Sequence, residues 1–109
     1  MFPVFVYVSE NYKSVGKLAK VLNTLDLGVF YIPKSCEDLL VTCDRLGLTA
    51  KLIPEPKLYG VLRQMFYILV FNDHTDPAAV NYVRYALNKG KNFIVIPDEE
   101  IPYIEMCEK

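Results

Sequence analysis

This sequence contains a series of short apolar runs separated by segments of helical periodicity, a pattern that few folds can accommodate. The runs are apolar at consecutive positions, which is typical of strands buried on both faces. They cover residues 2–8, 29–32, 50–53, 66–71 and 92–96. Parallel strands need long crossover connections, so strands that alternate with helices predict a parallel sheet with right-handed crossovers. The most apolar run, residues 66–71, is expected at the centre of the sheet.

The segments between the runs have the spacing and the end signals of helices. Helices are predicted over residues 15–25 and 36–46, with a short helix or turn over residues 57–65. Asp76 and Pro77 are typical of an N-cap and a first helical residue, so they begin the last helix. Its inward stripe is predicted to be Val80, Val83 and Leu87.

These elements predict one α/β domain over residues 1–109, with a Rossmann-like, doubly wound sheet. The sheet is expected to have about five mainly parallel strands, with helices on both faces. A chain of 109 residues can bury one core without further covalent links. The acidic tail, residues 98–109, is expected to form a short helix over one side of the sheet.

Composition argues against several classes of function. The net charge of −1 disfavours a nucleic-acid partner, and no apolar run reaches the length of a membrane span. The N-terminus lacks the basic region of a signal peptide, and three sparse cysteines indicate a reducing compartment, so we expect a cytoplasmic protein. Cys36 and Cys43, seven residues apart, are either core-facing or part of a zinc site. With His74 as the only histidine and no CxxC motif, we expect no metal.

Ligands of open parallel sheets bind at the carboxyl ends of the strands, where the strand order reverses. That rule selects the loops after the first, second and fourth runs, together with Pro97 and Asp98 after the fifth. The candidate ligand-binding residues there are Ser9, Asn11, Lys34, Ser35, Asn72, Asp73, Thr75 and Asp76. The Asp76 carboxylate is open to two interpretations: a simple helix cap, or a polar group of the site at the place where a phosphate would bind.

Two further candidates lie outside these loops. Arg63 could present a guanidinium fork to a ligand, or could form a surface ion pair with Glu55 or Asp73. Tyrosines near the expected crevice could stack on a base or simply fill the edge of the core. These tyrosines are Tyr12, Tyr59 and Tyr82, of which Tyr82 is retained as a candidate site residue.

No catalytic set is visible in the sequence. His74 has acidic neighbours but no obvious nucleophile, and Ser9 lacks the G-x-S-x-G motif. Neither a G-x-G-x-x-G nor a Walker A motif occurs. We therefore expect no catalytic residues and no cofactor.

One stretch of the chain resembles a known family. Residues 69–96 open with Leu-Val-Phe-Asn-Asp and continue through a helix to the turn Ala86-Leu87-Asn88-Lys89-Gly90-Lys91. They resemble the last βαβ unit of the SLOG superfamily, the Rossmann-like nucleotide-sensing domains related to LOG phosphoribohydrolases and DprA. The YspA-like branch is the most similar, and residues 36–54 and 60–64 resemble its earlier elements. The resemblance implies a nucleotide-like ligand.

The sequence departs from that family at the positions that carry its chemistry. The glycine-rich turn is replaced by residues 33–35, which contain no glycine, and the G-T pair by Ala78 and Ala79. The catalytic glutamate falls at Asn81 or Tyr82, and neither can replace a carboxylate. The resemblance therefore implies a degenerate member that binds without cleaving.

Three functions remain open at this point. The first is non-catalytic binding of a nucleotide or nucleotide-derived molecule, as a sensor or a sequestering sponge in phage–host conflict. The second is a protein-interaction module on a degenerate scaffold. The third is a nucleotide N-glycosidic hydrolase that depends on Asp73. Under each of them we expect a homo-oligomer, since a dimer would cover edge strands and aromatic surface.

Overall fold

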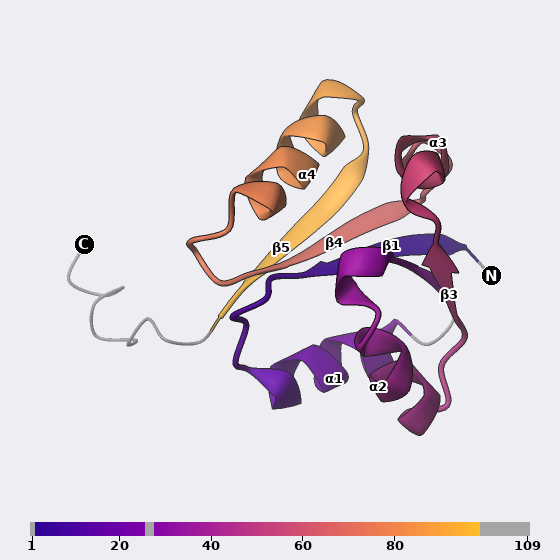
Figure 1. Cartoon of the computed structure of the whole chain (residues 1–109), viewed down its shortest axis with the longest axis vertical. Helices are drawn as coiled ribbons and strands as arrows, with labels where there is room; N and C mark the ends of the chain where they lie inside the picture. Colours follow the sequence, from indigo (N-terminus) through magenta and orange to yellow (C-terminus); the bar gives the residue numbers. More distant parts are fainter. Residues whose placement is uncertain (1, 26–27, 99–109) are drawn as a thin grey trace.

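The chain folds into a five-stranded, fully parallel sheet with helices on both faces. The computed structural model describes residues 2–25 and 28–98. The strands are β1 (Pro3–Val8), β2 (Val29–Pro33), β3 (Ala50–Ile53), β4 (Tyr67–Asn72) and β5 (Asn92–Pro97). Their order in the sheet is β3-β2-β1-β4-β5 (Figure 1). This order confirms the predicted α/β doubly wound fold. The helix expected over residues 98–109 lies, apart from Asp98, outside the described residues.

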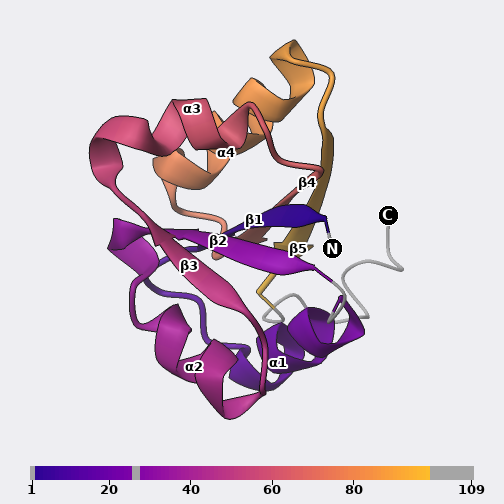
Figure 2. The ribbon, with the colours of Figure 1, turned by 90° about the vertical axis from the view of Figure 1, so that its right-hand side faces the viewer.

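The helices divide between the two faces of the sheet. They are α1 (Val15–Thr24), α2 (Leu39–Arg45), α3 (Leu58–Leu62) and α4 (Pro77–Asn88), with short 3₁₀ turns η1 (Lys34–Cys36) and η2 (Glu55–Lys57). Figure 2 shows α1 and α2 on one face and α3 and α4 on the other. The strand order reverses between β1 and β4, which places the switch point of the fold at the carboxyl ends of these two strands.

The centre of the sheet is β1, not the strand formed by the most apolar run. β1 pairs with β2 on one side and with β4 on the other, and Val4, Phe5 and Val6 are fully buried. The expectation that residues 66–71 form the central strand was therefore wrong by one position. Both strands lie inside the sheet with helices on both faces, so their apolar runs cannot be told apart by composition.

The inward stripe of α4 differs from the one predicted. Ala79, Tyr82 and Ala86 are buried, whereas the side chains of Val80 and Leu87 are 48% and 63% exposed. The Tyr82 ring lies 5.0 Å from Phe5 and 4.8 Å from Tyr7, between ring centroids. Because Ala79 and Ala86 are small, α4 lies close to the sheet, and the Tyr82 ring fills the space between the helix and the sheet. The predicted stripe is thus rotated by one residue, with only Val83 still packed against the core.

The second helix begins later than predicted. The chain leaves β2 through η1, and α2 starts only at Leu39. Cys36 and Cys43 are both free and buried, which confirms the core-facing interpretation. None of the helices in residues 2–25 and 28–98 combines the length and apolar character needed to cross a membrane.

Candidate functional site

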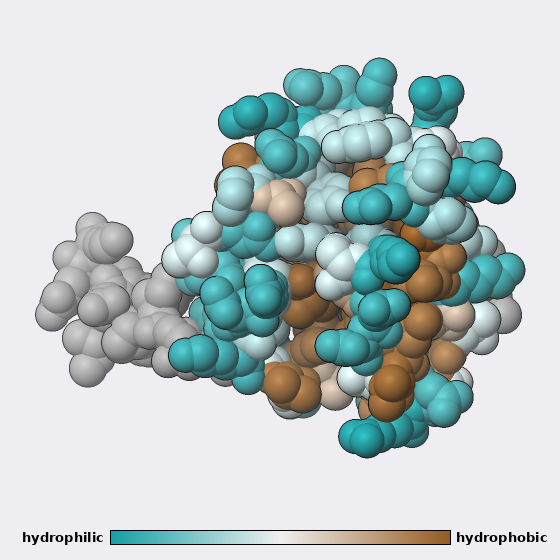
Figure 3. Space-filling view, viewed as in Figure 1, coloured by the Kyte–Doolittle hydropathy of each residue, from teal (hydrophilic) through white to brown (hydrophobic). Residues whose placement is uncertain are grey.

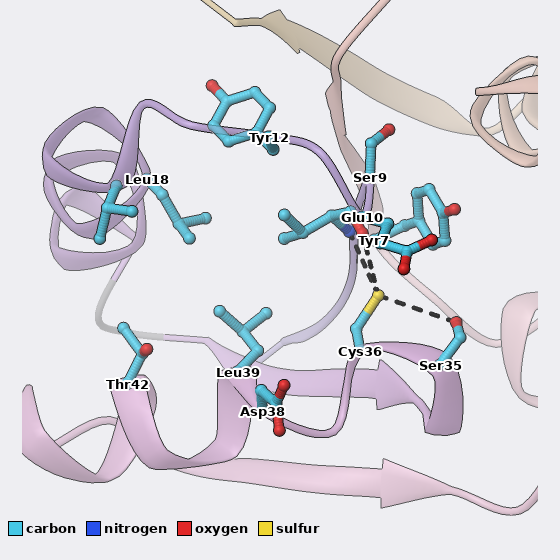
Figure 4. Close-up of a pocket in the computed structure, with 12 residues that line it drawn as sticks. Tyr7, Ser9, Glu10, Tyr12, Leu18, Ser35, Cys36, Asp38, Leu39 and Thr42 are labelled. Carbon is cyan, nitrogen blue, oxygen red and sulfur yellow. Dashed lines mark hydrogen bonds between the residues drawn. The ribbon is translucent and has the colours of Figure 1, made fainter. Parts of the chain in front are cut away.

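A pocket of about 560 Å³ lies at the carboxyl ends of β1 and β2, on the face covered by α1 and α2. Figure 3 shows a hollow with an apolar floor on this side of the molecule. Its walls come from the loop after β1, from α1, from η1 and from the first turns of α2 (Figure 4). The lining residues are Tyr7, Val8, Ser9, Glu10, Tyr12, Val15, Leu18, Ser35, Cys36, Asp38, Leu39 and Thr42.

The lining combines an apolar wall with carboxylate and hydroxyl groups. Leu18 of α1 faces Leu39 of α2 across the pocket (Figure 4). Val15 also lines it, and the acidic residues of the lining are Glu10 and Asp38. No lysine, arginine or histidine is among the lining residues. The pocket therefore offers hydrogen-bond acceptors and apolar surface, without a positive charge of its own.

The Cys36 thiol is held in the pocket wall by the backbone of Val8. The Val8 N–H donates to Cys36 Sγ at 3.4 Å, and the thiol donates to the Val8 carbonyl at 3.3 Å (Figure 4). Burial raises the pKa of the Cys36 thiol. A protonated, buried thiol is a poor nucleophile, so Cys36 is a structural part of the wall.

Ser9 is a buried polar residue at the edge of the pocket. It is only 2% exposed, and its Oγ has no hydrogen-bond partner among the described residues. Its side chain points away from Cys36 and Thr42 in Figure 4. An unsatisfied buried hydroxyl costs stability.

The polar loop after β4 satisfies its own hydrogen bonds. The His74 N–H donates to Asn72 Oδ1 at 2.9 Å, and the Thr75 N–H donates to Asp73 Oδ1 at 2.8 Å. His74 has a φ of 75°, which such Asx turns accommodate. Hydrogen bonds from Thr75 and from the backbone of Asn11 lower the pKa of Asp73. This loop contacts the loop after β1 but contributes no residue to the pocket lining.

Asp76 is the N-cap of α4. Its Oδ1 accepts from the Ala78 N–H at 3.0 Å, and its Oδ2 accepts from the Tyr7 hydroxyl. Burial, together with the Asp76 carboxylate, raises the pKa of Tyr7 above its ordinary range. The capping interpretation of Asp76 is confirmed.

A second carboxylate, Asp98, reaches the start of α1 from the end of β5. Asp98 Oδ2 accepts from the Lys13 N–H at 2.9 Å, and Oδ1 accepts from the Ser14 N–H at 3.1 Å and from the Ser14 hydroxyl. The Ser14 side chain does not itself cap the helix. The chain thus stabilises this end of α1 with a carboxylate that is 84 residues distant in sequence.

The structure places only some of the predicted site residues around the pocket. Ser9 and Ser35 line it, and Lys34 lies beside Ser35 on the exposed side of η1 without lining it. The backbone N–H of Asn11 donates a hydrogen bond to the Asp73 carboxylate. Asn72, Thr75 and Asp76 belong to the self-bonded loop and the α4 cap described above.

Arg63 and Tyr82 do not reach the site. Arg63 lies just before β4, at the amino-terminal edge of the sheet, where its carbonyl and that of Met65 accept from the Lys91 ammonium group. The pocket is at the opposite, carboxyl-terminal edge. Tyr82 is buried against Phe5, and burial raises the pKa of Tyr82 to about 12. Both placements correct the expectation that these side chains would face a ligand.

The remaining tyrosines divide in the same way. Tyr12 lines the pocket, with its ring at 79° to that of Phe71 and its hydroxyl 3.3 Å from the Pro97 carbonyl, to which it donates. Tyr59 instead packs against Tyr85, on the side of the sheet that α3 and α4 cover.

Sequence reasoning missed most of the wall that α1 and α2 supply. Leu39 and Thr42 share one face of α2, and Asp38 directly precedes this helix. Glu10 lies in a loop that was recognised, but this side chain was not singled out. Thr42 gave a usable signal, because it places a polar side chain on the helix face that also carries Leu39. The missed lining residues are Glu10, Val15, Leu18, Cys36, Asp38, Leu39 and Thr42, along with Tyr7 and Val8, whereas Tyr12 was expected near the crevice.

In the described part of the chain, no group of three or more His, Cys, Asp or Glu side chains could hold a metal ion. Comparison of the chain with protein-family models, with curated proteins and with solved structures gave no match.

Proposed function

We propose that this protein binds a small nucleotide-derived molecule in the pocket between α1 and α2, without transforming it. The observation that carries the proposal is the position of the pocket. It lies at the carboxyl ends of β1 and β2, on the edge of the sheet where doubly wound folds bind their ligands and beside the switch point between β1 and β4. Its volume of about 560 Å³ falls within the range of small-molecule sites.

The chemistry of the pocket supports binding rather than catalysis. The thiol in the wall is protonated and bonded to the backbone, and no histidine lines the pocket. Asp73, the residue on which a hydrolase would depend, is outside the lining and bonded to Thr75. Binding needs only an apolar wall and a few oriented polar groups, which the pocket has.

A thermal-shift panel of nucleosides and nucleotides tests the proposal. A ligand at a hundred times its Kd stabilises the folded state by about 2.7 kcal/mol, which is readily measured as a rise in Tm. In a Thr42→Phe variant the larger side chain fills the pocket, so the shift should be lost. In a matched Val41→Phe variant the new side chain points to solvent, so the shift should persist. A ligand-induced rise in Tm that persists in the Thr42→Phe variant would show that the ligand binds outside this pocket.

A protein-interaction module is the second candidate, and the exposed apolar side chains favour it. Val80 and Leu87 lie on the outer face of α4, and Ile94 and Val95 are exposed on the edge strand β5. This candidate predicts that no member of the panel raises Tm, and that Leu87→Lys weakens association with the partner while leaving the fold intact.

A further inference from the structure

Three features of the site bear on the charge of the ligand, and the first is the start of α1. In doubly wound folds, a ligand phosphate commonly sits at the amino end of the first helix, where free N–H groups and the helix dipole favour an anion. Here the Asp98 carboxylate accepts from the N–H groups of Lys13 and Ser14 and is only 5% exposed. A carboxylate of the protein therefore already lies beside the start of α1, where it would repel a phosphate.

The start of α4 is occupied in the same way. This helix begins directly after β4, on the other side of the switch point. Asp76 accepts from the Ala78 N–H at 3.0 Å and from the Tyr7 hydroxyl. A carboxylate of the chain therefore lies at the start of each helix that follows a switch-point strand, β1 or β4, and a phosphate would have to displace one of these carboxylates.

The pocket itself adds further negative charge. Glu10 and Asp38 line it, and no cationic side chain does. A phosphate bound there would lie near two like charges, whereas a hydroxyl or amino group could donate a hydrogen bond to either of them.

We propose that the ligand is a phosphate-free nucleoside-type molecule, neutral or cationic, whose hydroxyl or amino groups donate to Glu10 and Asp38. This proposal rests on the binding function proposed above. The ring of the ligand packs between Val15, Leu18 and Leu39, and its sugar hydroxyls face the carboxylates. Carboxylates that accept from a sugar diol are a common solution in folds of this type.

Isothermal titration with matched pairs tests the proposal. The probes are the common ribonucleosides and their 5′-monophosphates, titrated into the full chain. We expect at least one nucleoside to bind about tenfold or more tightly than its own monophosphate, because the phosphate meets the two carboxylates. A monophosphate that binds as tightly as its nucleoside, or more tightly, overturns the phosphate-free ligand but leaves the binding function standing. Absence of binding throughout both series overturns the two proposals together.

A variant without the two carboxylate charges tests whether charge, and not the shape of the pocket, causes the preference for the nucleoside. The double variant Glu10→Gln and Asp38→Asn keeps the size of both side chains and removes both charges. The preference for the nucleoside over its monophosphate should then fall by about tenfold. The control is Asp44→Asn, which removes an exposed carboxylate of α2 outside the pocket and should leave the preference unchanged. An unchanged preference in the double variant would show that these carboxylates do not select the ligand.

Discussion

Two aspartates that lie at helix starts, Asp76 and Asp98, differ in how far their roles can be predicted from the sequence. The role of Asp76 as a cap follows from its neighbours in sequence, since it precedes Pro77 and a helical segment. The role of Asp98 could not be predicted, because its partner Ser14 is 84 residues away and is reached only through the fold. Local chemistry was readable from the sequence, and long-range pairing was not.

Ser9 provides a residue-scale prediction. Its buried hydroxyl has no partner among the described residues, so Ser9→Ala should raise the free energy of unfolding by about 1 kcal/mol. Urea denaturation of the free protein measures the change. The control Ser35→Ala removes an exposed hydroxyl and should alter stability by less than about 0.5 kcal/mol. A clear loss of stability in Ser9→Ala would contradict the unsatisfied state of this hydroxyl.

Tyr82 makes stability sensitive to alkaline pH. Burial raises the pKa of this phenol from 10.0 to about 12 in the folded protein. The folded state therefore keeps the proton where the unfolded chain has lost it, so the contribution is complete below pH 10 and is lost as the pH rises toward about 12. The free energy of unfolding should fall over this interval, and it should fall less steeply in Tyr82→Phe. Equal slopes for the two proteins would refute the assignment.

For helices and strands, the sequence predicted all the strands and most of the helices. The prediction was wrong for the buried face of α4, where two neighbouring faces are both apolar and packing decides between them. In α4 the branched side chains Val80 and Leu87 suggested an inward face, but the small residues Ala79 and Ala86 face the sheet instead. Hydrophobicity alone favours the bulkier stripe. The distance between helix and sheet, which only the fold sets, favours the smaller one around Tyr82.

Paired variants of α4 test the corrected stripe. Ala86→Leu adds a bulky side chain to a fully buried position and should lower the free energy of unfolding by about 1–3 kcal/mol. Leu87→Lys changes an exposed position and should alter it by less than about 0.5 kcal/mol. Thermal or chemical denaturation of both variants gives the comparison. The reverse ranking would restore the stripe predicted from the sequence.

At the scale of the whole molecule, alternation of strands and helices was enough to predict the doubly wound sheet, because right-handed crossovers leave few alternatives. It also located the edge of the sheet where the pocket lies. The residues that line the pocket could not be predicted, since they depend on how α1 and α2 pack near the carboxyl ends of β1 and β2. The homo-oligomer stays a prediction, and light scattering would give the mass of the particle in solution.

A heteronuclear NMR titration of the full chain with the nucleoside that binds most tightly would show directly whether the pocket binds this ligand. We predict that the shifted amide signals cluster around the pocket, at Glu10, Ser35 and Thr42, while the signals of Arg63 and its neighbours at the opposite edge of the sheet stay in place. Shifts centred on the loop at residues 72–76 or on the outer face of α4, with those of the pocket unchanged, would contradict the central claim that this pocket is the binding site.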